Sequence, residues 1–299
     1  MAVGQAPAAS ILAPAASILA PARILQYFQY TGKRYQYTVL APLEQPVQHT
    51  KIKPWFKAAN SIATCPKKLK KNEYLIKNYI KSADKNIKLI YRGIDEKEYY
   101  QNYKPDQAWL NQWYEMYPDT RNTKLLTIAG RISPLKDFEK IISLAKSVKD
   151  NSPHRFKILI AGEAKDKHQK YLNTLKEKIK SLNLEGDVYF LNFRKDIKNI
   201  YSISSIVYNT SNKPESFGRS ILEPLSIGIP CIGYNRGGVK EILETLFPYG
   251  LVEPDDKESL LNKTLAILDA DNINIKENTE FLTSNMCKQT IDFYQEISS

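Results

Sequence analysis

From residue 124 onward, short apolar runs alternate with longer amphipathic stretches, and this alternation limits the choice of fold more than any other feature. Short apolar runs bounded by turns are typical of buried strands, whereas amphipathic periodicity is typical of helices. Strands that alternate with helices build a parallel sheet that is covered on both faces. The sequence therefore predicts an α/β fold with strands over 125–129, 156–161, 188–191, 206–208 and 231–234, and helices over 137–148, 165–182, 196–201, 220–227 and 239–246.

The chain before this region has a different composition. Residues 6–25 are a short Ala/Pro repeat whose prolines would interrupt any helix, so we interpret it as a disordered or recently duplicated tail. A weak membrane anchor is the alternative reading. The sequence contains no other apolar run of ~18 or more residues, so we predict no transmembrane span. A short strand over 86–91 and a last helix over 284–297 complete the predicted elements.

The charge of the chain favours an anionic partner. The net charge is +11, and residues 51–104 hold 14 Lys and Arg against 5 Asp and Glu, a net of +9. This excess fits an anionic membrane surface or a phosphorylated substrate, and a solvated helix face is the plainer reading. We expect no nucleic-acid partner, because no zinc motif or aromatic-interleaved motif accompanies the charge. Three scattered cysteines favour a reducing cytoplasm.

The stretch from Pro214 to Pro230 carries the strongest site signal. It follows a predicted buried strand, so Glu215 would lie on the loop between strand and helix, with Ser220 as the N-cap. Glu223 would lie on the first turns of the helix. Both carboxylates are then within reach of the crevice at the carboxyl ends of the strands, where open α/β sheets bind ligands. The free N–H groups of the helix start favour an anion, which suggests a ligand with hydroxyls and phosphates.

A second motif, Gly130-Arg131-Ile132-Ser133-Pro134-Leu135-Lys136, lies at the end of the first strand of this region. Glycine allows the backbone to approach a ligand closely. Arg131 and Lys136 bring two positive charges to the crevice, and a diphosphate leaving group needs such neutralisation. Asp269 and Asp271 also form an Asp-x-Asp pair, which we interpret as solvent-exposed because it lies far from the other motifs. A dinucleotide oxidoreductase is disfavoured, since no Gly-x-Gly-x-x-Gly follows a predicted strand.

Together these motifs resemble glycosyltransferase family 4, which has the GT-B fold, and most of all its lipopolysaccharide-type sugar transferases. The resemblance covers about residues 55–260. It rests on Gly130-Arg131-x-Ser133-Pro134-x-Lys136, Pro214-Glu215-Ser-Phe217-Gly218-Arg-Ser-Ile-Leu-Glu223, Gly228-x-Pro230, Asn235-Arg-Gly237-Gly238-Val239-x-Glu241-Ile242, Ile90-Tyr91-Arg92-Gly93-Ile94-Asp95 and Arg194-x-Asp196.

The resemblance implies a retaining, metal-independent transfer of a sugar from a nucleotide-diphosphate donor to a glycan or lipid-linked acceptor, in cell-envelope polysaccharide synthesis. Arg131 and Lys136 would hold the donor diphosphate. Glu215 would contact the sugar hydroxyls and stabilise positive charge at the anomeric carbon, and Glu223 would accept from the ribose hydroxyls. Backbone N–H groups at Phe217 and Gly218 would bind sugar or phosphate. The further substrate-binding candidates are Gly130, Glu163, Arg194 and Arg219.

The chain departs from this family before residue 130. The family has two Rossmann-like domains, and here the donor half looks complete while the acceptor half looks shortened. We predict a low-complexity tail over 1–30, a shortened basic acceptor-side region over 31–120, a donor-binding domain over 121–280 and a C-terminal helix over 281–299. Three alternatives follow: an active enzyme with a reduced first domain, one half of a split enzyme that needs a complementary N-terminal-domain chain, and an inactive remnant that only binds nucleotide sugar.

The expected location is the cytoplasm, and the basic charge leaves peripheral attachment at the inner face of the membrane open as an alternative. His49 is a weak candidate for a donor-side histidine that the family carries in its first domain. The base and sugar of the donor, the acceptor and the linkage have no signal in the sequence.

Overall fold

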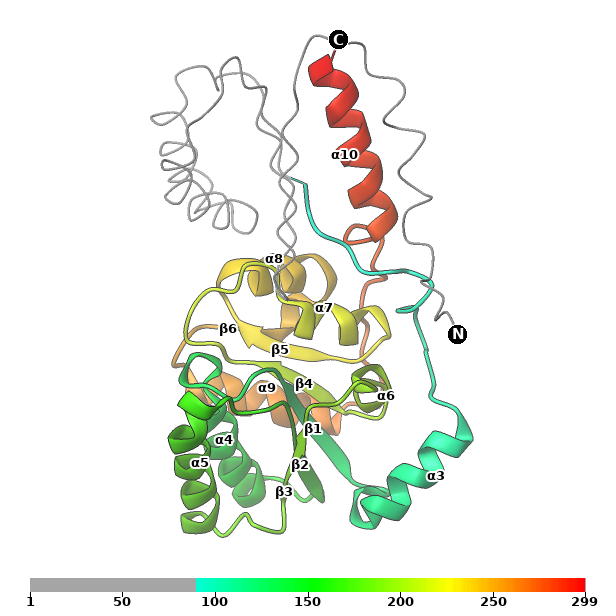
Figure 1. Cartoon of the computed structure of the whole chain (residues 1–299). Helices are drawn as coiled ribbons and strands as arrows, with labels where there is room; N and C mark the ends of the chain where they lie inside the picture. The colour runs from blue at the N-terminus through cyan, green and yellow to red at the C-terminus, as the bar shows by residue number, and fades with distance from the viewer. Residues whose placement is uncertain (1–89, 299) are drawn as a thin grey trace, which may run out of the picture. The chain divides into compact units, whose positions relative to one another are not determined.

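The structure, a computed structural model, describes residues 90–298, all of which belong to one compact unit of the chain (Figure 1). Within these residues the strands form a six-stranded parallel sheet in the order β3-β2-β1-β4-β5-β6. This order and the interleaved helices confirm the predicted α/β fold and its complete Rossmann-like domain. The Ala/Pro tail, most of the basic region and His49 lie outside the described residues.

The elements of this domain follow the predicted alternation closely. The strands are β1 (Lys124–Ala129), β2 (Phe156–Ala161), β3 (Val188–Asn192), β4 (Ile206–Asn209), β5 (Cys231–Tyr234) and β6 (Leu251–Val252). The helices are α3 (Gln107–Met116), α4 (Phe138–Asn151), α5 (Gln169–Ser181), α6 (Ile197–Ser202), α7 (Arg219–Ser226), α8 (Gly237–Leu246), α9 (Lys257–Asp269) and α10 (Thr283–Ser298).

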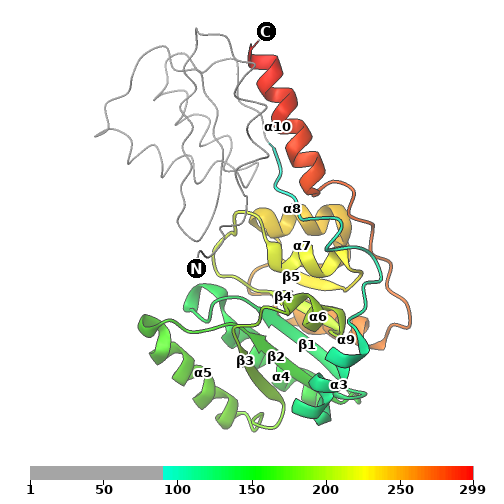
Figure 2. The ribbon, with the colours of Figure 1, turned by 45° about the vertical axis from the view of Figure 1, so that its right-hand side comes forward.

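The sheet is buried on both faces, which explains why its strands are continuous apolar runs rather than alternating ones. Successive residues of a strand point to opposite faces. Accordingly, Leu126 and Ile128 of β1 belong to the main core, while Leu125 packs in a second cluster around the fully buried Trp113 of α3. Helix α4 contacts both α5 and α9, and α7 contacts both α6 and α8 (Figure 2).

The sheet reverses its strand order between β1 and β4. Strand β1 pairs with β2 through the register Lys124↔Phe156 and with β4 through Leu126↔Ile206. The chain leaves β1 toward β2 and leaves β4 toward β5, so the loops that follow β1 and β4 diverge at the carboxyl edge. Ligands of open α/β sheets bind at such a switch point. The fold therefore places the loops after Ala129 and Asn209 on the two sides of one crevice.

Three local expectations are corrected by the structure. Helix α7 begins one residue before Ser220, and its N-cap is Gly218, whose φ of 93° is a left-handed conformation that glycine adopts easily. Helix α3, strand β6 and helix α9 are additional elements that were not predicted. Residues 90 and 91 are in no strand, because the chain pairs instead at Ile94, which forms a parallel bridge with Leu282 just before α10.

Candidate functional site

The site at the switch point is built around a contact between Lys136 and Glu215. Lys136 ends a 3-10 turn, η3 (Pro134–Lys136), in the loop after β1, and Glu215 lies in the loop between β4 and α7. The ammonium Nζ of Lys136 donates to the carboxylate Oε1 of Glu215, and the two side chains are 25% and 20% exposed. Two residues 79 positions apart are thus joined across the crevice while both stay accessible to a ligand.

The same carboxylate oxygen accepts two more hydrogen bonds from the end of β4. The amide Nδ2 of Asn209 donates to Oε1 of Glu215 at 2.9 Å, and the hydroxyl of Ser211 donates to it as well. Burial by itself would raise the pKa of Glu215. The charge and hydrogen bond of Lys136, with the hydrogen bonds from Ser211 and Asn209, outweigh burial and hold this pKa below its usual range. Glu215 is therefore ionised at neutral pH.

Helix α8 holds the Glu215 loop from the other side. The N–H of Gly238 donates to the backbone carbonyl of Glu215 at 2.9 Å. Gly237 has a φ of 63°, and a Cβ atom at this position would lie 2.6 Å from that carbonyl oxygen. Glycine is required there for both reasons. The close approach fixes the backbone that carries the Glu215 side chain.

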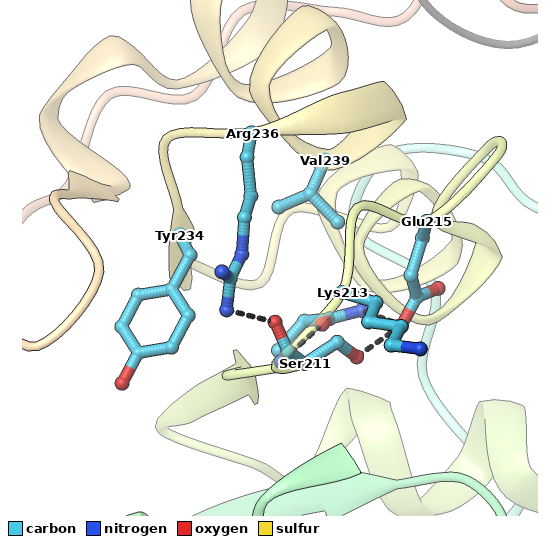
Figure 3. A pocket seen from close by; sticks show the side chains of 7 residues that line it. Ser211, Lys213, Glu215, Tyr234, Arg236 and Val239 are labelled. Carbon is cyan, nitrogen blue, oxygen red and sulfur yellow. Dashed lines mark hydrogen bonds between the residues drawn. The ribbon is translucent and has the colours of Figure 1, made fainter. Parts of the chain in front are cut away.

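A small hollow opens beside Glu215 (Figure 3). Its empty volume is about 140 Å³, which includes space open to solvent, so it is a shallow hollow rather than an enclosed cavity. The guanidinium of Arg236 closes one side by donating to the backbone oxygen of Ser211. The lining residues are Asn209, Ser211, Lys213, Glu215, Tyr234, Arg236 and Val239.

The other residues of the Gly130-Arg131 motif are placed at the tip of β1. Gly130 has a φ of 147°, and a Cβ atom on it would lie 3.4 Å from Cε of Lys136. Arg131 is exposed, and the structure does not bring its guanidinium into the pair formed by Lys136 and Glu215. Of the two predicted cations, Lys136 meets the acid and Arg131 remains open to solvent.

Glu223 has different surroundings from Glu215. Its residue is 6% exposed, and its carboxylate accepts from Nε of Arg219 at 2.7 Å on the same helix, with Tyr99 beside the pair. Burial raises the pKa of Glu223, and the Arg219 guanidinium offsets only part of that effect. The hollow beside Glu215 is not lined by Glu223. The structure therefore assigns the two predicted acids to separate clusters.

The remaining candidates lie at neighbouring strand ends. Glu163 follows β2 and is exposed, and its carbonyl accepts from the N–H of Ile132, which ties the loops after β1 and β2 together. Arg194 follows β3 and forms a two-pronged ion pair with Asp196 at 2.8 and 2.6 Å. Phe217 is 8% exposed, in the main core. These placements extend the candidate site along the carboxyl edge from β4 to β3.

Sequence reasoning missed Asn209, Ser211 and Arg236. Asn209 is the last residue of a buried strand and Ser211 lies two residues beyond it, and this position at the carboxyl end is a signal that could have identified them. Arg236 lies within a motif that was recognised, but its distance in sequence from Ser211 hides the contact.

Asp269 pairs with His154 at 2.7 Å. No group of three or more His, Cys, Asp or Glu among residues 90–298 is arranged to hold a metal ion. No helix in this part of the chain is long and apolar enough to span a membrane.

Comparison with known proteins places this geometry in a family. Residues 117–295, more than half of the chain, match the family model of glycosyl transferases group 1. The chain is 26% identical over 186 residues to the N-acetyl-alpha-D-glucosaminyl L-malate synthase of Bacillus anthracis, which covers 62% of the chain and 45% of the relative. It is 29% identical over 159 residues to an Escherichia coli UDP-Gal:alpha-D-GlcNAc-diphosphoundecaprenol alpha-1,3-galactosyltransferase, covering 52% of the chain and 39% of the relative. The chain thus spans less than half the length of these curated relatives.

A solved structure supports the same assignment. The Anabaena protein HepE in complex with UDP is 26% identical and aligns with a TM-score of 0.55, over 71% of this chain and 56% of HepE. The family match and the fold confirm the resemblance drawn from the sequence motifs, including its GT-B fold. The chain belongs to the glycosyl transferases group 1.

Proposed function

We propose that the chain transfers a sugar from a nucleotide-diphosphate donor to a glycan or lipid-linked acceptor with retention of configuration. The contact between Lys136 and Glu215 at the switch point carries this proposal. When the bond between sugar and phosphate breaks, negative charge develops on the diphosphate and positive charge on the anomeric carbon. A cation and a carboxylate side by side, in a partly buried site, stabilise both charges.

The residues of the crevice have separate roles in this proposal. Lys136 and Arg131 bind the diphosphate, and the glycine at 130 lets the backbone approach it. Glu215, ionised at neutral pH, contacts the sugar hydroxyls and the developing positive charge. Backbone N–H groups at Phe217 and Gly218, at the start of α7, bind sugar or phosphate, since a helix start favours an anion.

The nucleoside half of the donor lies toward β2 and β3 in this proposal. Ribose hydroxyls donate to Glu223 and so replace its contact with Arg219. Glu163 and Arg194 flank the base from the loops after β2 and β3. The UDP complex of HepE supports a uridine diphosphate donor, and uridine diphosphate is the first nucleotide to test.

The acceptor and the setting are also proposals. The name of the Escherichia coli relative specifies a diphosphoundecaprenol-linked sugar as its acceptor, which supports a lipid-linked acceptor and a role in cell-envelope polysaccharide synthesis. The net charge of +11 supports a cytoplasmic protein that attaches peripherally to an anionic membrane. The transfer is metal-independent in this proposal, because Lys136 and Arg131 supply the positive charge for the leaving diphosphate.

Calorimetric titration with uridine, guanosine and adenosine diphosphates, followed by transfer assays with the sugar of the preferred base, tests the proposal. Glu215→Ala and Lys136→Ala are each expected to lower transfer by roughly 10²-fold or more while the protein stays folded. Transfer should persist in EDTA, and the product should keep the donor's anomeric configuration by NMR. Unchanged turnover in Glu215→Ala would contradict the role given to this carboxylate.

A non-catalytic module that binds nucleotide sugar, or half of a split enzyme, is the second candidate. The departure of the sequence from the family before residue 130 favours it. Binding of the nucleotide without hydrolysis or transfer would identify such a module. Transfer that appears only when a complementary N-terminal-domain chain is added would identify a split enzyme.

A further inference from the structure

Asn209 and Ser211 occupy a rigid position beside the proposed catalytic carboxylate. Asn209 is the last residue of β4, in the middle of the sheet, and the two side chains belong to residues that are 4% and 6% exposed. Groups at the end of a central strand are held more precisely than groups on a free loop. The orientation of Asn209 therefore reflects the fold, and the backbone of Ser211, two residues beyond the strand, is held by hydrogen bonds with Asn209 and Arg236.

The hydrogen bonds of Asn209 fix the orientation of its amide. Its Nδ2 donates to Oε1 of Glu215 at 2.9 Å and to the hydroxyl of Ser220 at 3.0 Å. Its Oδ1 accepts from the backbone N–H of Ser211 at 3.2 Å. Reversing the amide would bring its oxygen against the Glu215 carboxylate, so these partners permit one orientation.

All three donors that reach the Glu215 carboxylate from the described residues bind the same oxygen. Lys136, Asn209 and Ser211 contact Oε1, so the other carboxylate oxygen, Oε2, can still accept hydrogen bonds from a ligand. Figure 3 shows the hydrogen bond from Ser211 ending on one carboxylate oxygen, while the other oxygen points away from it. The hydrogen bonds thus distinguish the two oxygens.

We propose that Asn209 and Ser211 are positioning residues, which hold Oε1 of Glu215 so that Oε2 faces the transferred sugar. The inference rests on the proposed function and deepens it. In that function Lys136 has two partners, because it contacts Glu215 and also binds the donor diphosphate. When Lys136 turns to the diphosphate, the two neutral donors keep the carboxylate in place and ionised.

The groups around Glu215 that can affect its titration come from four elements. Lys136 approaches from η3, and Lys213 lies in the same loop as Glu215 and lines the hollow. Tyr234 at the end of β5 and Arg236 before α8 line the opposite side. The cations favour the ionised carboxylate in every variant, so a change after substitution of Ser211 reports on its hydrogen bond.

The test follows the titration of the Glu215 side chain by carbon-13 NMR in the full chain, once without UDP and once with UDP. The Glu215 signal is assigned as the one that is lost in Glu215→Gln. The variants are Ser211→Ala and Asn209→Ala, with Ser211→Thr to restore the hydroxyl. Matched controls are Ser202→Ala and Asn278→Ala, which remove a hydroxyl and an amide of similar burial that bond elsewhere. Thermal unfolding shows which variants remain folded, and Ser211→Ala decides the question if Asn209→Ala does not fold.

In Ser211→Ala the midpoint of the Glu215 titration should move upward by about one pH unit, and further when UDP is bound. The acid limb of kcat/KM should move in the same direction, with kcat falling more than the donor KM rises. Ser211→Thr should restore both. An unchanged midpoint in Ser211→Ala, or an equal shift in the two controls, would overturn the inference. The NMR titration of Glu215 needs no turnover. A chain that transfers no sugar would therefore refute the proposed function, while the titration would still decide whether Ser211 and Asn209 position the carboxylate.

Discussion

Two carboxylates on the same stretch of chain have their pKa values moved in opposite directions by their surroundings. Glu223 is buried and Glu215 is partly buried, and burial acts on both in the same sense, by raising the pKa. Glu215 has three donors on one oxygen and stays ionised, whereas Glu223 has one guanidinium that is largely exposed to water. The charge and hydrogen bonds of the neighbouring donors therefore decide the direction in which each pKa moves.

A third acid, Glu241, is partly buried without a hydrogen-bond partner for one of its oxygens, Oε1, among the described residues. Burial and the charge of Glu244 raise the pKa of Glu241 to about 7. The folded protein thus holds a proton that the unfolded chain releases near pH 4.5, so the free energy of unfolding falls as the pH rises through about 7. Glu241→Gln removes this loss, and at pH 8 it should be more stable than the parent by about 1 kcal/mol after allowance for partial exposure.

Urea denaturation of the Glu241→Gln variant at pH 5 and pH 8 checks this prediction. The two proteins should have similar free energies of unfolding at pH 5, where the carboxyl is protonated. Glu244→Gln serves as the control, since it removes the neighbouring charge, together with its ion pair to Lys240, and should give a smaller gain at pH 8. A Glu241→Gln variant that is less stable than the parent at pH 8 would contradict the reasoning.

The loop from β4 to α7 is positioned by its contact with the start of α8. The N–H of Gly238 binds the carbonyl of Glu215, and Gly237 allows the backbones to touch. Gly237→Ala should displace the loop, because the new Cβ would lie 2.6 Å from that carbonyl oxygen and φ would be strained. We expect a loss of about 1–3 kcal/mol in the free energy of unfolding and a clear loss of transfer.

Gly186→Ala is the matched control for this element, because a Cβ atom there meets nothing within 4 Å. Its free energy of unfolding and its affinity for UDP should both stay close to those of the parent. Equal transfer by Gly237→Ala and the parent would show that the contact between the loop and α8 does not position Glu215.

At the scale of the whole molecule, nucleotide binding should stabilise the fold. A ligand that binds only the folded chain adds about 2.7 kcal/mol to the free energy of unfolding at a concentration of 100 Kd. UDP should therefore raise the unfolding temperature in a concentration-dependent way, and uridine, which lacks the diphosphate, should raise it less. Lys136→Ala should lose most of the difference between the two ligands. Equal stabilisation by UDP and uridine would contradict the diphosphate site at Lys136.

Much of the element order was predictable because buried parallel strands are apolar on both faces. The predicted strand over 156–161 coincides with β2, and the helix over 137–148 corresponds to α4, which ends three residues later at Asn151. Helix α9 was missed, since its apolar and polar residues are distributed around the helix and give weak periodicity. The predicted strand over 86–91 was wrong at residues 90 and 91, because pairing at Ile94 depends on Leu282, nearly 200 residues away.

The sequence by itself determined the parallel α/β sheet and the two motifs at its carboxyl edge, because apolar periodicity and glycine positions are local properties. It also placed Lys136 and Glu215 on loops that follow different strands. Only the tertiary structure decided that Lys136, Asn209 and Ser211 meet on one oxygen of Glu215, and that Glu223 turns to Arg219 instead. The physical reason is that strand order brings β1 next to β4, and hydrogen bonds across this boundary join residues that no local pattern relates.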